Sequence, residues 1–326
     1  MIGGILAGLV TGALWGLTFV APRAVAPFSA VDLAIARYMI FGIASIALMA
    51  WPAFRPRGIG VGPSLVAVLL GSAGYIGYFL AAAFAVRYAG AAVPPLVIGL
   101  LPVALAIIGN WTNADVRWSR LALPLSMICA GVLLINVREV LNAGEPTARN
   151  QVLFGVLCAY VALAIWIAYG VVNAKALRAA GGPSPLAWTG LQGLGSGLGA
   201  LPLFAAACVG GAPSMLLNQA ATAQQWTVFL GWSVVMGIAG SWVATWCWSI
   251  ASRNLPLSLS AQLIVAETVF GLAYGFIYEH RWPAIAEWAG IALQMVGVAV
   301  AISVFTSKPA PVSDATLEEG VSSNRA

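Results

Sequence analysis

The sequence contains few charged residues. Only 8% of its 326 residues are Asp, Glu, Lys or Arg, whereas 61% are hydrophobic. A soluble domain carries about 25% charged residues, because its surface must face water. The composition therefore excludes a soluble globule of this size and predicts that lipid covers much of the outside. The apolar runs are continuous and about 20 residues long, the length that crosses a bilayer as helix. This pattern predicts an all-α polytopic membrane protein and argues against a β-barrel.

Residues for several kinds of chemistry are also scarce. His280 is the one histidine, and the four cysteines lie in or beside apolar segments without metal-ligand or redox-motif spacing. No nucleophile–base pair or phosphate-binding loop is visible, so we expect no catalytic residues, no cofactor and no bound metal. The 15 Lys and Arg residues form no basic stripe, which argues against nucleic-acid binding. We expect the partners to be a small-molecule substrate and the lipid bilayer, with the protein acting as a monomer.

Ten apolar segments are visible, and each is predicted to be a transmembrane helix. With the tail included, Lys and Arg residues number nine on the side of the N-terminus and six on the other, so the positive-inside rule favours cytoplasmic termini. The tail 307–326 contains Ser, Pro and Glu and is predicted to be disordered. The ten segments are 3–20, 31–51, 63–86, 91–111, 121–137, 152–172, 185–206, 225–251, 257–278 and 283–305.

The chain contains an internal repeat. An offset of 151 aligns two positions of the first segment with the sixth, and an offset of 166 aligns four later positions. The difference, 166 − 151 = 15, predicts an insertion between 209 and 224. The repeats are 1–138 and 151–306, and an odd number of spans in each places the second upside down. Such inverted repeats are typical of secondary transporters that work by alternating access, although a duplicated scaffold without transport is the alternative. The matched pairs are Gly4 with Gly155, Trp15 with Trp166, Gly71 with Gly237, Gly74 with Gly240, Arg87 with Arg253, and Gly131 with Gly297.

Glu267 is the acidic residue that we place well inside a span. A charged side chain at the bilayer centre costs roughly 2.5–3.5 kcal/mol on insertion scales, so it usually faces a cavity or is protonated. It is predicted to bind a substrate ammonium or carry a coupling proton. The alternative is a hydrogen bond to a neighbouring helix that holds the ninth span in place. Gln262, five residues earlier, is a second polar candidate, for which helix–helix hydrogen bonding is the alternative.

Aromatic residues in mid-span are the other candidates for substrate binding. Aromatic rings hold flat side chains, and their faces attract ammonium groups; the alternative is that they fill a core or face lipid. Two overlapping GxxxG pairs in the seventh span, Gly193 with Gly197 and Gly195 with Gly199, predict close helix approach. The aromatic candidates share helix faces at i, i+3 or i, i+4 spacing, apart from Trp15, which stands alone: Trp15, Tyr75, Tyr78, Phe79, Trp166, Tyr169, Trp242 and Trp246.

Several motifs resemble those of the drug/metabolite transporter superfamily, in particular its EamA-type bacterial exporters. They are GALWGLTFV over 12–20, Arg37 early in the second span, and AETVFG over 266–271 followed by Tyr278-Glu279-His280-Arg281. Thr268 stands where the family has proline, whereas the first half keeps Leu101-Pro102-Val103. The resemblance extends over almost the whole chain.

The sixth span resembles that of the aromatic amino-acid exporters in this superfamily. Trp166-Ile167-Ala168-Tyr169 is followed by Asn173 and Lys175. This similarity implies export of aromatic and other neutral amino acids across the bacterial inner membrane, with both termini in the cytoplasm. The alternatives are export of other metabolites or cationic drugs, exchange of sugar phosphates or nucleotide sugars, and a channel.

Overall fold

The structure, a computed structural model, describes residues 2–90, 93–101, 103–105, 107–108, 118–142, 146–179, 181–209, 221–255 and 263–306. These residues form helices joined by turns and short irregular segments, with no strand among them. The predicted all-α class is confirmed. A bilayer favours this outcome, because a helix satisfies its backbone hydrogen bonds internally where no water is present.

Six helical stretches are long and apolar enough to cross a membrane: Ile2–Phe19, Ala30–Leu48, Val61–Ala89, Ala148–Arg178, Pro185–Val209 and Ala223–Asn254. They match the first, second, third, sixth, seventh and eighth predicted spans. Shorter apolar helical stretches, Leu96–Leu105, Ala122–Gly131, Val269–Tyr278 and Ile285–Gly297, lie within the other four predicted segments. The chain is therefore a multi-pass membrane protein, whereas the count of ten spans stays a prediction.

The first three stretches are built from short elements. The first contains α1 (Ile2–Gly16) and η1 (Leu17–Phe19) and leads into α2 (Ala21–Ala24). In α3 (Ala30–Leu48) the Ser29 hydroxyl accepts a hydrogen bond from the backbone N–H of Asp32, and the Asp32 side chain accepts one from the backbone N–H of Ser29. This reciprocal capping fixes the start of α3. The short η2 (Pro52–Phe54) precedes a third stretch of α4 (Val61–Leu69), η3 (Leu70–Tyr75) and α5 (Ile76–Ala89).

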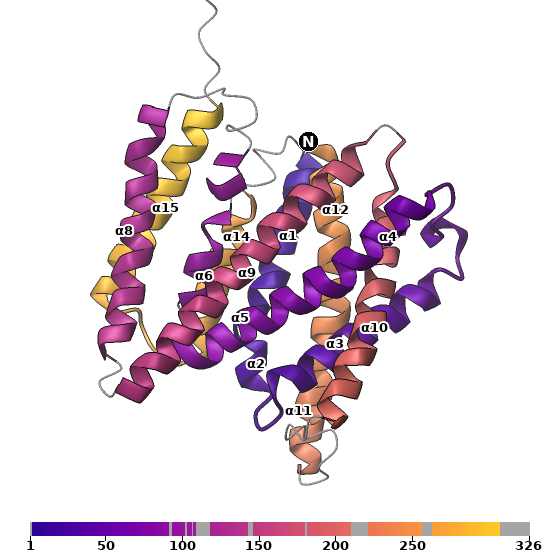
Figure 1. Ribbon diagram of the computed structural model, residues 1–326, viewed down its shortest axis with the longest axis horizontal. Helices are drawn as coiled ribbons and strands as arrows, with labels where there is room; N and C mark the ends of the chain where they lie inside the picture. The colour runs from indigo at the N-terminus through magenta and orange to yellow at the C-terminus, as the bar shows by residue number, and fades with distance from the viewer. Residues whose placement is uncertain are drawn as a thin grey trace, which may run out of the picture.

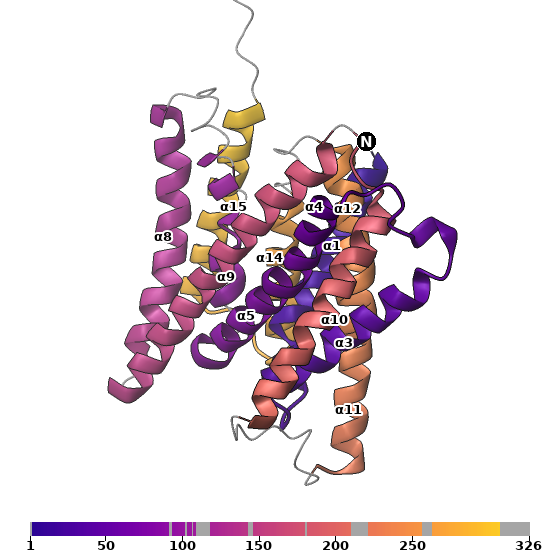
Figure 2. The same ribbon diagram turned by 45° about the vertical axis from the view of Figure 1, so that its right-hand side comes forward.

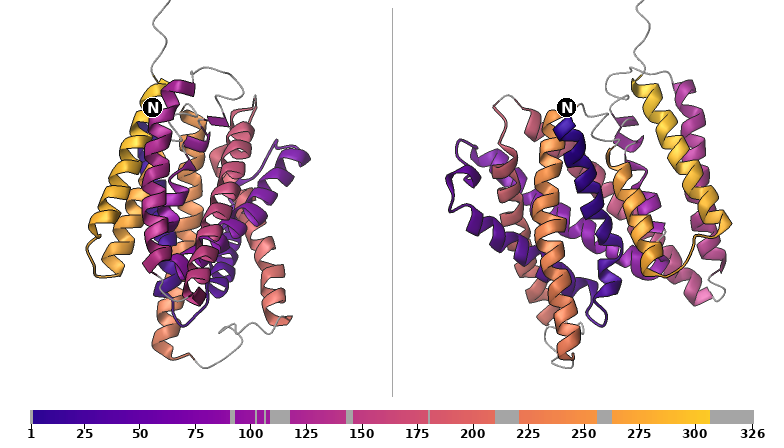
Figure 3. Two further views of the ribbon diagram at one scale, coloured as in Figure 1. Left: turned by 60° about the vertical axis from the view of Figure 1, so that its left-hand side comes forward. Right: turned by 180° about the vertical axis from the view of Figure 1, so that it is seen from behind.

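The remaining helices complete the bundle. They are α6 (Val93–Ile98), α8 (Trp118–Asn142), α9 (Pro146–Arg178), α10 (Pro185–Val209), α11 (Ala223–Val234), η4 (Val235–Val243), α12 (Ala244–Asn254), α14 (Val265–Tyr278) and α15 (Ile285–Thr306). Figure 1 shows α9 running obliquely beside α5, with α8 and α15 paired at one edge. The same pairing is visible after the turn in Figure 2, where α10 lies against α3. From behind, Figure 3 shows α1 beside α12.

Two π-helical segments occur at related positions. The third predicted span contains η3 (Leu70–Tyr75) and the eighth contains η4 (Val235–Val243). Adding 166 to 70 and 75 gives 236 and 241, which fall inside η4. A π-helical turn has a wider hydrogen-bond ring and frequently marks a functional site. Both segments also carry matched glycines of the repeat.

Matched glycines of the two predicted repeats each contact the other repeat, and we call such a reciprocal pair exchanged contacts. A Cβ on Gly71 would overlap the backbone of Gln192 in α10, whereas a Cβ on Gly237 would lie 3.0 Å from the carbonyl oxygen of Arg37 in α3. The third span therefore approaches the seventh closely, and the eighth approaches the second. The two pairs of spans occupy equivalent places in the two predicted repeats.

A second pair of close contacts is related by the same repeat. A Cβ on Gly4 would lie 2.9 Å from Leu255, and a Cβ on Gly155 would lie 2.7 Å from the backbone nitrogen of Ala89. The two partners are separated by 255 − 89 = 166 residues, the offset of the repeat in that region. At Gly155 the backbone of Ala89 leaves no room for a side chain, whereas at Gly4 the space is filled by the Leu255 side chain.

The GxxxG pairs of α10 permit close approach, as predicted. Gly197 lies against Gly42 of α3, with 3.0 Å between an added Cβ and the Gly42 Cα, and a Cβ on Gly193 would overlap the Ser45 hydroxyl. On the neighbouring face, a Cβ on Gly195 would overlap the carbonyl of Val68 in α4. The helix α10 is thus held between α3 and the α4–η3 segment by two rows of glycine.

Three predictions lie wholly or largely outside the described residues. They concern the inserted segment 209–224, of which residues 210–220 are not described, the disordered tail 307–326 and Gln262. The division into two inverted repeats stays a prediction.

Candidate functional site

Five of the predicted aromatic residues lie together in the middle of the bundle. Trp166 stacks on Tyr78, with 4.4 Å between ring centroids, and on Tyr169 at 4.5 Å. Trp15 packs edge-on against Trp166 at 5.0 Å, and Tyr75 lies 5.1 Å from Tyr169. All five are 2–5% exposed, so they face neither lipid nor water. We call Trp15, Tyr75, Tyr78, Trp166 and Tyr169 the aromatic cluster.

Glu267 lies beside this cluster, in the first turn of α14. Tyr78 donates a hydrogen bond of 2.8 Å to its Oε1 atom, and the residue is 1% exposed. Its Oε2 atom is buried and has no hydrogen-bond partner among the described residues. A buried carboxylate oxygen is costly to leave unpaired. The arrangement therefore offers one free acceptor for a donor, such as an ammonium group, beside aromatic ring faces.

A polar chain continues from the aromatic cluster into α10. The hydroxyls of Tyr75 and Tyr169 lie 2.6 Å apart, and Tyr169 donates to Oε1 of Gln192 at 3.4 Å. The Gln192 amide donates to Oδ1 of Asn173 at 3.1 Å. The Asn173 Nδ2 atom is buried and has no partner within the described part of the chain. Among the described residues, an unpaired acceptor, Oε2 of Glu267, thus lies on one side of the cluster, and an unpaired donor, Nδ2 of Asn173, lies at the other end of this polar chain.

The other predicted aromatic residues lie outside the cluster. Phe79 is buried against Tyr38, with ring centroids 5.9 Å apart. Trp242 and Trp246 do share a helix face, at 6.0 Å, but Trp242 packs on Phe54, at 5.8 Å. The described contacts therefore bring together Trp15, Tyr75, Tyr78, Trp166, Tyr169 and Glu267, and leave Phe79, Trp242 and Trp246 beside them.

Two residues of α12 that we did not predict join the cluster. Trp248 lies 5.6 Å from Trp15, and Thr245 donates to the Tyr75 hydroxyl at 3.0 Å. The indole nitrogen of Trp248 is buried and unpaired among the described residues. Small polar residues inside an apolar span usually face the bundle interior. The Ser241–Thr245 spacing of four was therefore the signal that could have identified this face.

Arg37 is buried next to this region, in α3. It donates from Nε to Ser241 Oγ at 2.7 Å and from Nη2 to the carbonyl of Gly240 at 2.9 Å. Its guanidinium also lies over the Phe79 ring, 4.8 Å from the centroid. Ser241 and Gly240 belong to the π-helical η4. Arg37 therefore joins α3 to the segment that leads into Thr245 and Trp248.

Glycines of α1 bring Glu267 close to the cluster. Gly4, Gly8, Gly12 and Gly16 recur every four residues, and a Cβ on Gly12 would lie 2.9 Å from the backbone nitrogen of Glu267. A Cβ on Gly16 would lie 2.9 Å from the nitrogen of Gly271. The sequence analysis did not single out this four-glycine row, which the small-residue rule for membrane helices could have identified.

An ionic network lies where α14 meets α15. Arg281 donates to both carboxylate oxygens of Glu287, at 2.8 and 2.9 Å, and to Glu279. Arg23 also donates to Glu279 and, through Nη2, to the carbonyl of Val86 at 3.3 Å. Hydrogen bonding to the Glu287 carboxylate, with Glu279 contributing, raises the pKa of Arg281 above its usual range. The network therefore ties the end of the first span to the ninth and tenth.

Comparison with known proteins agrees with these features. The fold and its long apolar helices define a multi-pass membrane protein. The chain is 31% identical over 316 residues to the inner membrane protein YtfF of Escherichia coli strain K12, covering 95% of this chain and 98% of that protein. It belongs to the family of that protein. No family model matches the chain.

A solved structure supports the fold. One crystal structure of a protein aligns with 91% of this chain and 96% of its own, with a TM-score of 0.60 and 21% sequence identity. At that identity the likeness concerns the fold alone.

Proposed function

We propose that this protein is a secondary transporter of the drug/metabolite transporter superfamily, of the EamA type. It exports aromatic and other neutral amino acids from the bacterial cytoplasm by alternating access. The observation that carries the proposal is the buried Glu267, whose Oε2 atom has no partner among the described residues and which lies beside Tyr78 and Trp166.

The exchanged contacts support ten spans arranged as two inverted repeats. Gly71 approaches α10 as Gly237 approaches α3, and Gly4 approaches Leu255 as Gly155 approaches Ala89. A two-fold relation between the halves would produce such pairs. Two related halves can open alternately to either side of the membrane around a site at their interface. Ten spans would place both termini on the same side, and the excess of Lys and Arg on that side favours the cytoplasm.

The chemistry of the site matches a zwitterion with a flat side chain. The substrate ammonium would bind Oε2 of Glu267 and the neighbouring ring faces, since both attract cations. The substrate carboxylate would accept a hydrogen bond from a buried donor, for which the indole nitrogen of Trp248 is unpaired within the described structure. The aromatic side chain would stack within the aromatic cluster.

Counterflow in proteoliposomes tests the proposal. Vesicles loaded with unlabelled phenylalanine should accumulate labelled phenylalanine in a saturable manner, and the Glu267→Gln variant should lose at least nine-tenths of that flux. Glu318→Gln, which removes a carboxylate from the tail, is the matched control and should leave the flux unchanged. Flux that rises linearly with concentration would indicate a channel and overturn the proposal.

Proton coupling is examined in the same vesicles. If Glu267 carries the coupling proton, a pH gradient should drive wild-type uptake, and the Glu267→Gln variant should keep some exchange while losing the response to the gradient. Unchanged gradient-driven uptake in the variant would eliminate this role for Glu267.

Lipophilic cations are a second candidate substrate class. A buried carboxylate beside stacked rings also suits a cation that carries apolar groups. Tetraphenylphosphonium that is itself transported, with phenylalanine neither transported nor competing, would favour this class over amino acids. Sugar phosphates fit less well, because the buried Arg37 already donates to Ser241 and Gly240.

A further inference from the structure

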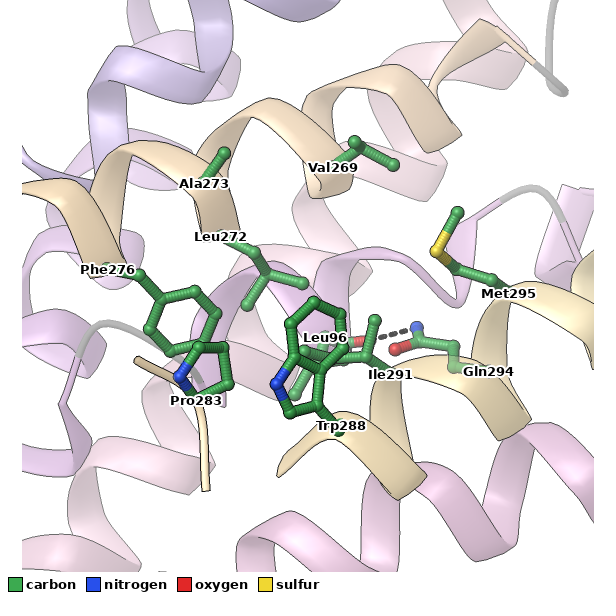
Figure 4. A pocket seen from close by; sticks show the side chains of 10 residues that line it. All are labelled: Leu96, Val269, Leu272, Ala273, Phe276, Pro283, Trp288, Ile291, Gln294 and Met295. Atoms are coloured by element: carbon green, nitrogen blue, oxygen red, sulfur yellow. Dashed lines mark hydrogen bonds between the residues drawn. The ribbon is translucent and has the colours of Figure 1, made fainter. Parts of the chain in front are cut away.

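A cavity lies away from the aromatic cluster, between α14 and α15. Its volume is about 210 Å³. Leu96 of α6, Leu272 and Ile291 form its buried floor, and Val269 and Met295, which are 40% and 42% exposed, stand at its rim. Figure 4 shows these side chains around the cavity, together with the rings of Phe276 and Trp288. The cavity is therefore apolar, partly aromatic and open at the outer surface of the helix bundle.

Among the described residues that line the cavity, Gln294 carries the one amide, and Trp288 adds an indole N–H. Gln294 is 2% exposed, and its Nε2 atom donates to the carbonyl oxygen of Leu96 at 2.5 Å. A carbonyl oxygen can only accept, so this bond fixes which end of the amide is nitrogen. The Oε1 atom is buried and has no hydrogen-bond partner in the described part of the molecule.

Helix packing explains the Nε2 end of this glutamine, which bonds to α6, but not its Oε1 end. Position 128, which lies 166 residues earlier in the repeat, holds Ile128, a buried residue of α8 that contacts Gly297 of α15. An apolar residue therefore serves at the equivalent place in the first half. A buried acceptor without a partner disfavours the empty site, and it can be satisfied by a ligand that brings a donor.

We propose that this cavity binds a small, apolar aromatic molecule that carries one N–H or O–H donor and enters from the lipid phase. The donor would bond to Oε1 of Gln294, while the ring would lie against Leu272 and Phe276. An engineered apolar cavity of 150 Å³ in another protein binds benzene, so the present volume suits one ring or a small pair of fused rings. A lipid acyl chain would fill the apolar part but would leave Oε1 unpaired.

The experiment uses indole and two analogues as probes. Purified full-length protein in detergent would be titrated with 5-fluoroindole and followed by fluorine NMR, with indole, benzothiophene and 1-methylindole as competitors. Benzothiophene has a similar shape without a donor, and 1-methylindole has its donor blocked. Indole should compete about tenfold better than either analogue, because a buried hydrogen bond is lost with both. Equal competition by the three would overturn the proposal.

Three variants locate the binding. Gln294→Met keeps the side-chain length but removes the amide. Indole, benzothiophene and 1-methylindole should then compete about equally, while all three still bind. Val269→Trp fills the rim from an exposed position and should abolish binding of all probes. Gln224→Met, at an exposed site of α11, is the control and should change nothing. Preference retained in Gln294→Met, or binding retained in Val269→Trp, would contradict the assignment.

The central site needs its own control, because its rings could also hold indole. Glu267→Gln and a saturating concentration of phenylalanine should leave the binding of 5-fluoroindole at this cavity unchanged. Displacement by phenylalanine would place the probe in the aromatic cluster instead and would overturn the proposal. The outcome does not depend on whether the protein transports amino acids.

Discussion

Tyr78 of α5 donates a hydrogen bond to Glu267 of α14, although 189 residues separate them in the chain. The same tyrosine ring stacks on Trp166 of α9. One side chain thus connects a buried carboxylate to the aromatic cluster and sets the position of the Oε1 atom. The other oxygen is left without a partner among the described residues, so the orientation of the Glu267 carboxylate depends on Tyr78.

Removing this hydroxyl should weaken both folding and transport. In Tyr78→Phe, Oε1 of Glu267 loses the donor that the structure assigns to it, which should lower the free energy of unfolding by about 1–3 kcal/mol. Thermal unfolding in detergent and phenylalanine counterflow would measure the two effects, and we expect flux to fall about tenfold. Tyr274→Phe, on the same helix as Glu267, is the control. If Tyr78→Phe and Tyr274→Phe showed the same stability and the same flux, Tyr78 would have no specific role at Glu267.

The glycine rows of α10 should tolerate no added methyl group. In Gly195→Ala the new Cβ overlaps the carbonyl of Val68, and the shift of α10 away from α4 should cost about 1–3 kcal/mol. Gly231→Ala adds the same group where no atom lies within 4 Å, so its melting temperature should match or exceed that of wild type. A Gly195→Ala protein as stable as Gly231→Ala would show that α10 packs differently.

Arg37 and Ser241 should show strong energetic coupling. A double-mutant cycle with Arg37→Gln and Ser241→Ala should give a coupling energy of about 1.5–3 kcal/mol, the range for hydrogen bonds to charged groups. Chemical denaturation in mixed micelles would provide the four free energies. Arg37→Lys should not restore stability, because one ammonium cannot reproduce the two directed bonds to Ser241 and Gly240. Simple additivity of the two changes would indicate that the buried bond is energetically unimportant.

The inverted repeat predicts where equivalent loops lie. Gly58 follows the second span and Ala223 follows the seventh, so the two positions should face opposite sides of the membrane. In a variant whose four cysteines are replaced by alanine, Gly58→Cys should be protected from a membrane-impermeant maleimide added to whole cells. Ala223→Cys should be labelled. Labelling of both, or of neither, would mean that the halves are parallel.

Several features followed from the sequence alone for physical reasons. The scarcity of charge required lipid around the chain, and lipid requires backbone hydrogen bonds within helices, so the all-α fold was predictable. The GxxxG spacing of α10 predicted close contact because helical neighbours recur every four residues. The lone carboxylate in the ninth predicted span identified Glu267, since burying it is costly anywhere in a membrane.

Which side chains meet at the site was decided by the tertiary structure. Periodicity correctly placed Trp242 and Trp246 on one helix face, but it could not say which face of the eighth span meets α1 and η3. The face that does so carries Thr245 and Trp248, and it follows the π-helical η4, whose wider turn departs from the period of 3.6 residues. A helical pattern specifies neighbours along one helix, whereas the contact of Tyr78 with Glu267 depends on how separate helices pack.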